Sequence, residues 1–419
     1  MIINVRIDNS FVFGNEVELS LKADMRNKKF ATNVYTENNH NILKAVGIYG
    51  PNNVGKTCLI KSIRNIRNVL LNKEITVRSN IFNKSTICEM GVTFLEAGRE
   101  FKYDFKYDAK TNEYLYERFV EIIQDQYFNK KEILMLIKDS VSKEYYYFKE
   151  KSLEQMLPLT AKNNILIYLI DTDEFDSFRE IKNILVSFAS KIEVIDMNNI
   201  PIGKTIELLK NKDKMQEKIV NFIKNSDLDM DNYRYIDDSS IALKVSKIAD
   251  GKVEEDALNI PERLMDQIRL TSVYKGIPVP SLIFDSTGTK KIAALASYII
   301  EALEKGKILV IDELDSSIHF KLTRAIVAMF NNELNVNSQL IFSVHDINLM
   351  DCKKLFRKEQ IWFVHKDKTG IYLYSLAEFT ANKDGIRDTT DIIDKYRKGI
   401  LGALPEPDMI NTLLEVKHE

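Results

Sequence analysis

The sequence has few cysteines, almost no net charge and no long apolar run, and each shortage excludes a class of protein. Its three cysteines, Cys58, Cys88 and Cys352, show neither a metal-ligand nor a CxxC spacing, which fits a reducing cytosol. The formal net charge of −2 excludes a global basic field for nucleic acid and leaves only a local basic groove open. The longest apolar stretch, residues 292–303, is too short to cross a bilayer and predicts a buried helix.

No signal peptide is visible, because residues 1–10 alternate apolar and polar side chains in the manner of a strand. We therefore expect a cytoplasmic protein that does not enter a membrane. The 419 residues, 45% of them apolar, suffice for two or three domains, or for one domain with a large insert.

Residues 50–57 read Gly-Pro-Asn-Asn-Val-Gly-Lys-Thr, which is a phosphate-binding P-loop. The apolar residues 43–49 before it predict a buried strand, and residues 58–71 after it carry apolar side chains at helical spacing. A loop in this position can turn its backbone N–H groups around a phosphate, and the helix start adds its positive dipole end. A chance glycine match in an ordinary turn is the alternative, and the flanking strand and helix argue against it.

The side chains of the P-loop have separate expected roles. Lys56 should reach the β- and γ-phosphates of a nucleotide, and Thr57 should ligate Mg²⁺. Cys58 directly follows, and packing of a small side chain in the first helical turn is the more ordinary explanation for it. The residues that we predict to bind the nucleotide here are Asn52, Asn53, Gly55, Lys56, Thr57 and Cys58.

A second group of segments predicts an antiparallel sheet joined to the P-loop core. Apolar and polar side chains alternate over residues 2–7, 16–22, 90–96, 100–107 and 113–120. In the fourth segment, aromatic side chains fall on one face and charged side chains on the other, as in a sheet that is covered on one side only.

Residues 125–275 differ in composition and predict a mostly helical insert. They are rich in Lys, Asn, Asp and Ile, with helical spacing over residues 206–224. Apolar clusters at 165–170 and 181–188 indicate that the insert packs a small core of its own. Its lysine-rich stretches could contact a partner or a nucleic acid, although a charged helix face is usually only solvated.

The α/β pattern returns after about residue 280. Residues 308–311 are apolar and predict a strand of a parallel sheet, and Asp312 and Glu313 follow at its carboxyl end, where ligands bind in such sheets. Asp312 would hold Mg²⁺ through water, and Glu313 would orient and deprotonate an attacking water. An apolar run followed by acids is weak support alone, and it becomes strong downstream of a P-loop.

Two further segments complete the predicted site. The turn at residues 285–291 reads Asp-Ser-Thr-Gly-Thr-Lys-Lys and precedes a helix, so Ser286 and Gly288 would form a second anion nest that caps the γ-phosphate held by a second copy of the chain. The alternative is a plain turn in which Ser286 or Thr289 caps the helix. His345 follows the apolar strand 339–344, where it would hydrogen-bond the γ-phosphate, whereas an isolated histidine would more often be structural.

Taken in order, these motifs resemble the ABC-type ATPase heads of SMC, RecF and OLD-family proteins. The order is P-loop, insert, Ser-x-Gly signature, Asp-Glu Walker B motif, a D-loop at residues 315–317 and a switch histidine. Three motifs, Asp-Glu-Leu-Asp-Ser-Ser-Ile-His, Ser-Val-His-Asp-Ile-Asn-Leu-Met-Asp and Gln-Ile-Trp-Phe-Val, together with the tail 395–405, resemble bacterial abortive-infection ATPases of the AbiLi or RloA type, and more distantly the PARIS-system ATPase. The resemblance covers both ends of the chain and not residues 125–270.

The resemblance implies an ATP-driven switch in anti-phage defence, in which two heads sandwich two ATP molecules with Mg²⁺ and work with a separate nuclease effector. ATP rather than GTP follows from the resemblance alone. A RecF- or SMC-like DNA-repair ATPase and an ATP-locked scaffold with little turnover stay open as alternatives. The signature is Ser-Thr-Gly-Thr instead of Ser-Gly-Gly-Gln, and no glutamine lies between Cys58 and Glu121, where a Q-loop glutamine is sought.

The predicted fold class is α/β, a P-loop ABC-type ATPase head with an antiparallel β subdomain and an inserted, mostly helical subdomain. We expect the N-terminal part of the head over residues 1–124, the insert over 125–275, the C-terminal part of the head over 276–394 and a tail over 395–419.

Overall fold

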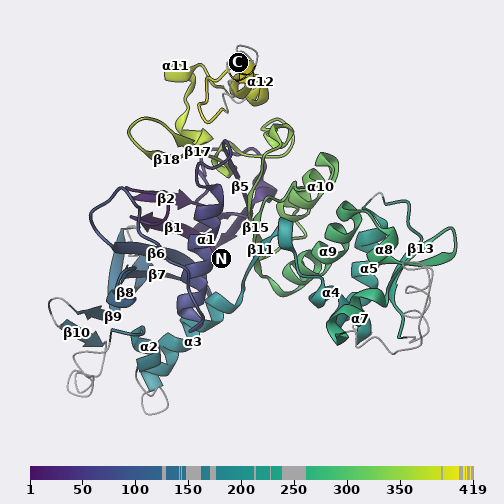
Figure 1. Ribbon diagram of the computed structural model, residues 1–419. Coiled ribbons are helices and arrows are strands. Elements are labelled where there is room, and N and C mark those ends of the chain that lie inside the picture. The colour runs from purple at the N-terminus through teal and green to yellow at the C-terminus, as the bar shows by residue number, and fades with distance from the viewer. Residues whose placement is uncertain are drawn as a thin grey trace.

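The computed structural model describes residues 1–124, 129–140, 142, 144–147, 162–169, 176–211, 214–226, 228–237, 261–387, 390–404, 409–410, 412 and 416. A parallel sheet that carries the P-loop lies in the middle of the molecule (Figure 1). An antiparallel sheet lies on one side of it and a helical lobe on the other, and the C-terminal segment packs at the top of the view. The predicted α/β class, with a P-loop core joined to an antiparallel sheet, is confirmed.

The central sheet has the order β11-β15-β16-β5-β17-β18, and only β18 runs antiparallel to its neighbour. Every residue of β5, β15 and β16 is buried, as expected for parallel strands that are covered on both faces. Helix α1 packs on one face, and α9 and α10 pack on the other. These elements are β5 (Ala45–Tyr49), β11 (Ile192–Asp196), β15 (Ile308–Asp312), β16 (Gln339–Ser343), β17 (Ile361–Lys366), β18 (Ile371–Ser375), α1 (Lys56–Leu70), α9 (Thr287–Lys305) and α10 (Phe320–Asn331).

The antiparallel sheet has the order β10-β9-β8-β7-β6-β1-β2. Its inner face is aromatic, as the alternation predicts, and it packs on α1 and α3. The rings of Phe94 on β6 and Phe188 on α3 stack with centroids 3.8 Å apart. The elements are β1 (Ile2–Asp8), β2 (Val17–Ser20), β6 (Ile87–Glu96), β7 (Arg99–Asp108), β8 (Glu113–Gln124), β9 (Lys130–Asp139), β10 (Glu144–Tyr147), α2 (Leu166–Leu169) and α3 (Asp176–Ser190), with a small hairpin of β3 (Val34–Glu37) and β4 (His40–Leu43).

The helical lobe has a core of its own, in which α4 and α5 pack on α9. The small side chains of Ala293 and Ala296 let these helices approach α9 closely. The elements are α4 (Gly203–Lys210), α5 (Met215–Lys224), α7 (Glu262–Ile268), α8 (Ser281–Phe284) and a sheet of β12 (Asn232–Tyr235), β13 (Leu270–Tyr274) and β14 (Ile277–Pro280). Near the C-terminus follow α11 (Ala381–Asp384) and α12 (Ile392–Arg397).

The expectation of one helical insert over residues 125–275 is wrong. Strands β9 and β10 extend the antiparallel sheet, and β11 joins the central sheet beside β15. The apolar clusters around Ile165 and Phe188 belong to the main core instead of a separate one. Strand pairing is a long-range contact that composition does not reveal. Residues 125–128, 148–161, 170–175 and 238–260 of the expected insert, and most of the tail after residue 404, lie outside the described residues, and the other boundaries stay predictions.

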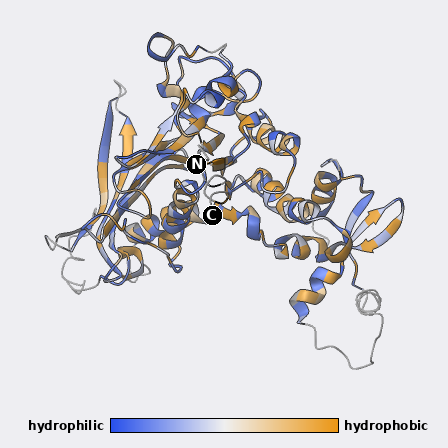
Figure 2. Ribbon diagram, turned by 45° about the horizontal axis from the view of Figure 1, so that its top comes forward, coloured by the Kyte–Doolittle hydropathy of each residue, from blue (hydrophilic) through white to orange (hydrophobic). Residues whose placement is uncertain are grey.

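Hydrophobic and hydrophilic residues alternate along the helices and along the strands of the antiparallel sheet in Figure 2. Among the helices that the structure describes, none has the length and apolar character needed to cross a membrane.

Candidate nucleotide-binding site

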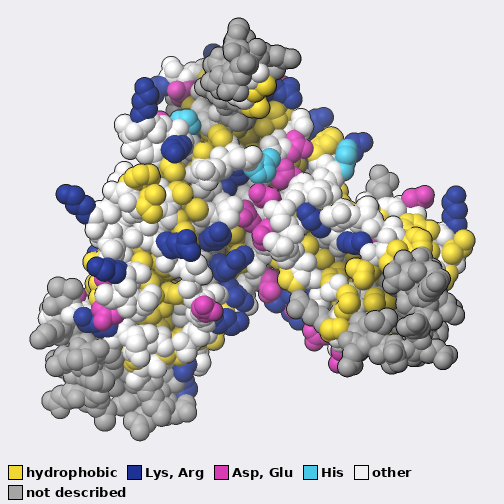
Figure 3. Space-filling model, viewed as in Figure 1, with side chains coloured by type: hydrophobic (Ala, Val, Ile, Leu, Met, Phe, Trp, Pro, Cys, Tyr) yellow, Lys and Arg dark blue, Asp and Glu magenta, His cyan; other side chains and the backbone are white. Residues whose placement is uncertain are grey.

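Four loops meet at the carboxyl edge of the central sheet. Strands β5, β11, β15 and β16 run parallel, so the residues after them leave the sheet at the same edge. The P-loop follows β5, Glu313 follows β15, His345 follows β16 and Asn198 follows β11. This edge therefore gathers a phosphate loop, carboxylates, an imidazole and an amide. On the face in Figure 3, acidic and histidine side chains gather in the middle, and lysine and arginine side chains lie beside them over α1.

Two glycines of the P-loop occupy positions that a side chain would not fit. Gly50 has a φ of +148°, and a Cβ atom there would lie 2.3 Å from the carbonyl oxygen of Val364. Gly55 has a φ of +125°, and its Cβ would lie 2.7 Å from Cγ2 of Val12. Helix α1 begins directly after Gly55 without a side-chain cap, so its first N–H groups are left for an anion.

Lys56 is folded back on the loop that carries it. Its Nζ donates to the carbonyl oxygens of Gly50 at 2.6 Å and Pro51 at 2.8 Å. Burial lowers the pKa of Lys56 to about 8, against the opposing effect of the nearby carboxylates of Glu313 and Asp312. A poorly hydrated ammonium group beside free N–H groups is suited to a triphosphate.

A cavity of about 650 Å³ opens beside the P-loop. Asn53 and Cys58 form the wall on the loop side, and Phe11 and Phe82 lie among the other lining residues. Burial raises the pKa of the Cys58 thiol, so this side chain is a neutral wall and not a nucleophile. The size and the mixed lining suit a nucleoside attached to a phosphate on the loop.

Asp312 and Glu313 are linked to the neighbouring strand by Ser343. The buried Asp312 accepts a hydrogen bond from Ser343 Oγ at 2.5 Å through Oδ1, and Ser343 Oγ accepts one from the backbone N–H of Glu313 at 2.7 Å. Glu313 has a φ of +54°, which is unfavourable for a residue with a side chain and is typical of functional sites. We did not predict a role for Ser343 from the sequence. Its position two residues before His345, at the end of the strand next to β15, could have indicated that it lies at the site.

The carboxylate of Glu313 lies between an amide and an imidazole. Asn198 Nδ2 donates to Glu313 Oε2 at 2.7 Å, and His345 Nε2 lies 3.7 Å from Glu313 Oε1. The backbone N–H of His345 donates to Asp315 Oδ2 at 2.9 Å, which fixes the histidine to the D-loop. The structure thus brings the two predicted catalytic residues, Glu313 and His345, together and adds Asn198, which the sequence analysis did not identify.

The signature turn has structural roles within its own chain. Ser286 Oγ accepts a hydrogen bond of 3.1 Å from the N–H of Thr289 and so caps α9, as the simpler explanation predicts. A Cβ atom on Gly288 would lie 2.6 Å from the carbonyl oxygen of Ser317 in the D-loop. The side chain of Ser286 is exposed, and among the described residues no hydrogen bond joins this turn to the P-loop of the same chain.

The residues present fit a magnesium ion that arrives with a nucleotide. Mg²⁺ usually takes one or two protein oxygens and completes its shell with phosphate oxygens and water. Thr57 on α1 and Asp312 at the end of β15 are the predicted pair, and Asp312 is buried beside Ser343. In the part of the chain that the structure describes, no group of three or more His, Cys, Asp or Glu side chains could hold a metal by itself.

The sequence model of a family described as "AAA domain, putative AbiEii toxin, Type IV TA system" matches residues 45–351. No curated protein matches the chain. Among solved structures, the SMC head domain from Thermotoga maritima is 13% identical, with 89% of this chain and 98% of that chain covered and a TM-score of 0.42. The Smc head with an extended coiled coil bound to the C-terminal domain of ScpA from Pyrococcus furiosus is 12% identical, with 94% and 99% covered and a TM-score of 0.43.

Proposed function

Because the chain belongs to the AbiEii-type AAA-domain family, we propose that it is an ATPase that works as a nucleotide-driven switch in bacterial anti-phage defence. The arrangement around Glu313 is the observation that carries the hydrolytic part of this proposal. Its carboxylate lies at the sheet edge that holds the P-loop, is fixed by Asn198 and has His345 Nε2 3.7 Å away. A binder that never hydrolyses its nucleotide would not need this arrangement.

The chemistry follows from the positions of these groups. Glu313 accepts a proton from water while the water oxygen bonds to the γ-phosphorus and the bond to the β–γ bridging oxygen breaks, which gives ADP and phosphate. Lys56 and the free N–H groups of α1 stabilise the charge on the phosphate oxygens. When bound at Thr57 and Asp312, Mg²⁺ supplies further stabilisation of that charge. His345 hydrogen-bonds the γ-phosphate from the side of Glu313.

We propose that each nucleotide is held by two chains, with Lys56 and Thr57 of one and Ser286 and Gly288 of the other. The exposed position of Ser286 at the start of α9 supports this arrangement. Exposed apolar side chains also lie beside both halves of the site. They are Ile283 (41% exposed) and Phe284 (53%) before the signature turn, and Ile81 (86%) and Phe82 (87%) at the cavity beside the P-loop. A second chain would remove them from water.

Nucleotide binding then drives the pairing of the chains, because each nucleotide that bridges two copies stabilises the closed pair by mass action. Hydrolysis reopens it. The family description names an AbiEii toxin and a type IV TA system, which supports a defence role, and the AbiLi and RloA resemblance points to a separate nuclease as the effector. The change between open and closed pairs is the signal that such an effector reads.

The Glu313→Gln variant tests this proposal. It keeps the shape of the site and removes the proton acceptor, so phosphate release should fall about 100-fold or more while ATP binding persists. The variant should also accumulate as a closed pair with ATP in size-exclusion chromatography with light scattering. Glu333→Gln, at an exposed carboxylate, is the matched control. Unchanged turnover in Glu313→Gln would remove hydrolysis from the proposal, and a wild-type protein without turnover would favour the ATP-locked scaffold.

A DNA-repair ATPase is the second candidate, favoured by basic side chains over α1 (Figure 3). Lys61 is exposed and Arg64 is half-buried on this helix, and neither forms an ion pair within the described residues. Such a protein should hydrolyse ATP faster when duplex DNA is added, with a strong dependence on salt. If added DNA does not change the rate of ATP hydrolysis, this candidate is excluded and the defence switch is the remaining proposal.

A further inference from the structure

Hydrogen bonds connect the signature helix to Glu313 within one chain. Lys291 Nζ on α9 donates to Ser316 Oγ at 3.0 Å, and Ser316 Oγ donates to Asn198 Oδ1 at 2.9 Å. Asn198 Nδ2 then donates to Glu313 Oε2 at 2.7 Å. Three separate segments of the chain thus form one path from the start of α9 to the proposed proton acceptor.

Asn198 is exposed, yet both its side chain and its backbone are fixed. Oδ1 and Nδ2 each have a partner, and the backbone N–H of Asn198 donates to Asp196 Oδ1 at 2.9 Å. Asp196 pairs with Asp312 in the register of β11 and β15, so the chain leaves β11 beside Glu313. An exposed asparagine normally keeps its rotamer freedom, so this double restraint points to a role.

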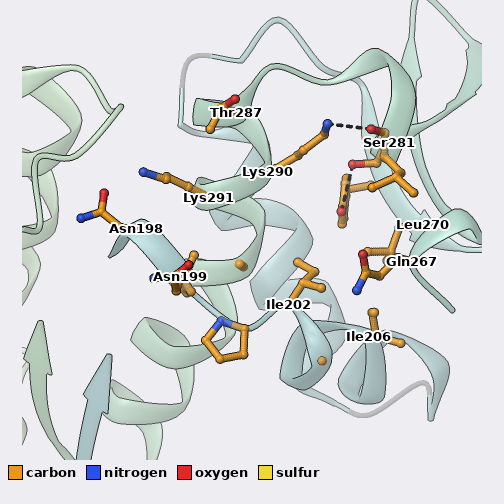
Figure 4. A pocket seen from close by; sticks show the side chains of 16 residues that line it. Asn198, Asn199, Ile202, Ile206, Gln267, Leu270, Ser281, Thr287, Lys290 and Lys291 are labelled. Atoms are coloured by element: carbon orange, nitrogen blue, oxygen red, sulfur yellow. Dashed lines mark hydrogen bonds between the residues drawn. The ribbon is translucent and has the colours of Figure 1, made fainter. Parts of the chain in front are cut away.

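Two neighbouring lysines at the start of α9 point in different directions (Figure 4). Lys291 extends toward Asn198 at one end of a cavity of about 440 Å³, and its Nζ also lies 3.2 Å from Ser317 Oγ. Lys290 extends to the other side, where its Nζ donates to the carbonyl oxygen of Leu282 at 2.6 Å. Only Lys291 therefore touches the path to Glu313, and Lys290 provides a control one residue away.

We propose that Asn198 is the positioning residue of Glu313, and that Ser316 and Lys291 connect it to the signature helix, so that the two nucleotide sites of a closed pair are coupled. This inference rests on the proposed function. In the closed pair, the start of α9 faces the nucleotide of the partner, whereas Glu313 serves the nucleotide of its own chain. When the triphosphate of the partner chain binds at the start of α9, Lys291 moves. The hydrogen bonds through Ser316 and Asn198 then transmit this movement to Glu313.

The Asn198→Asp variant tests the positioning role, because it keeps the shape of the side chain and replaces an amide donor by a negative charge. The other charged or titratable groups around Glu313 are Asp312 on its own strand, Lys56 on α1, Asp315 in the D-loop and His345 after β16. The added negative charge repels the Glu313 carboxylate and moves it out of position, so kcat should fall about tenfold while KM for ATP stays at the wild-type value.

The affinity of Asn198→Asp for a non-hydrolysable ATP analogue should stay at the wild-type value, since Asn198 does not belong to the P-loop. Asn198→Ala, which removes the amide donor without adding a charge, should lower kcat less than Asn198→Asp does. A kcat of Asn198→Asp that equals the wild-type kcat overturns the positioning role. If Glu313→Gln still abolishes turnover in that case, the proposed function stands and only this inference falls.

Lys291→Met tests the coupling, with Lys290→Met as the matched control. The wild-type protein should show a Hill coefficient above 1 for ATP in steady-state turnover, and Lys291→Met should reduce it to 1 while Lys290→Met leaves it unchanged. Binding of the non-hydrolysable analogue to the P-loop should be the same in all three proteins. A wild-type Hill coefficient of 1, or an equal effect of the two lysine variants, overturns the coupling.

Discussion

The P-loop and the signature turn are both glycine-containing turns that open a helix, yet their helix starts differ. Helix α1 has no side-chain cap, and Gly50 and Gly55 hold backbone angles that residues with a side chain rarely adopt. Helix α9 is capped by Ser286, and Gly288 makes room for Ser317 of the same chain. The P-loop therefore leaves the N–H donors at the start of α1 without a side-chain acceptor. In the signature turn, one of the N–H donors at the start of α9 already has an acceptor in Ser286 of the same chain.

The difference shows how an anion site is recognised in a structure. Free N–H groups at a helix start, with a buried lysine beside them, indicate a primary phosphate site. A capped turn with an exposed serine can add contacts to a phosphate that is held elsewhere, and it is a poor site alone. This contrast is the physical reason for assigning the two turns to two different chains.

Replacing Lys56 by alanine should have the largest effect. It removes the only ammonium group that contacts the loop carbonyls in the described site, and charge-assisted contacts to a phosphate contribute about 3 kcal/mol, so affinity for ATP should fall about 100-fold or more. Isothermal titration calorimetry measures this directly. Lys61→Ala on the exposed side of α1 is the control. An unchanged dissociation constant in Lys56→Ala would mean that the P-loop is not the primary site.

Ser286→Asp should come next, and it separates capping from phosphate contact. Aspartate caps a helix as well as serine does, so α9 should stay folded, while its charge opposes the γ-phosphate of the partner chain. Turnover should fall about 100-fold with ATP affinity of the single chain retained. Ser286→Asn keeps the cap without the charge and should lose less. Equal turnover in Ser286→Asp and the wild type would restrict Ser286 to its capping role.

Gly288→Ala should have a smaller effect that combines stability with turnover. The new Cβ would lie 2.6 Å from the carbonyl oxygen of Ser317, so the D-loop must shift. We expect a loss of about 1–2 kcal/mol in the free energy of unfolding, measured by urea denaturation, and a several-fold loss of turnover. Gly203→Ala on α4 meets nothing within 4 Å and should be neutral. A Gly288→Ala protein as stable as the wild type would show that this contact is readily accommodated.

The pH dependence of ATP binding should be the smallest effect near neutrality. The pKa of Lys56 in the free chain is lowered to about 8, and binding needs the protonated amine. Affinity should therefore be full below pH 8 and weaken as pH rises above it, by at most about tenfold per unit. Lys56→Arg stays protonated and should give a flat profile. A wild-type profile that is also flat from pH 7 to pH 9 would contradict the buried state of this ammonium group.

Much of the site could be predicted from sequence because its chemistry is local. The P-loop is a continuous segment whose glycines, lysine and threonine act side by side, and Glu313 follows its strand directly. Asn198 and Glu313, in contrast, lie 115 residues apart and meet only because β11 pairs with β15. The place where a Q-loop glutamine would be expected also depends on strand pairing. We looked for this glutamine between Cys58 and Glu121. The strand that pairs with the Walker B strand β15 is β11, which comes after the whole antiparallel sheet in the chain, so its following loop lies outside the range in which we looked.

The fold shows the same division. Strand β7 was predicted within one residue at each end, since it has one aromatic face that must be buried, whereas one end of β6 and one end of β8 were missed by three or four residues. Strand β9 was assigned to a helical insert because its residues 133–137 are all apolar and show no alternation, and its place depends on pairing with β8. The helical pattern over residues 206–224 forms two helices, α4 and α5, separated by a break after Lys210.

Complementation between two inactive variants tests the shared nucleotide site most directly. Lys56→Ala lacks a working P-loop, and Ser286→Asp lacks a working signature turn. When the two are mixed, a mixed pair joins the intact P-loop of one chain to the intact signature of the other, so ATP turnover should reappear although each variant alone is inactive. A mixture that stays as inactive as its components would contradict the claim that two chains hold each nucleotide.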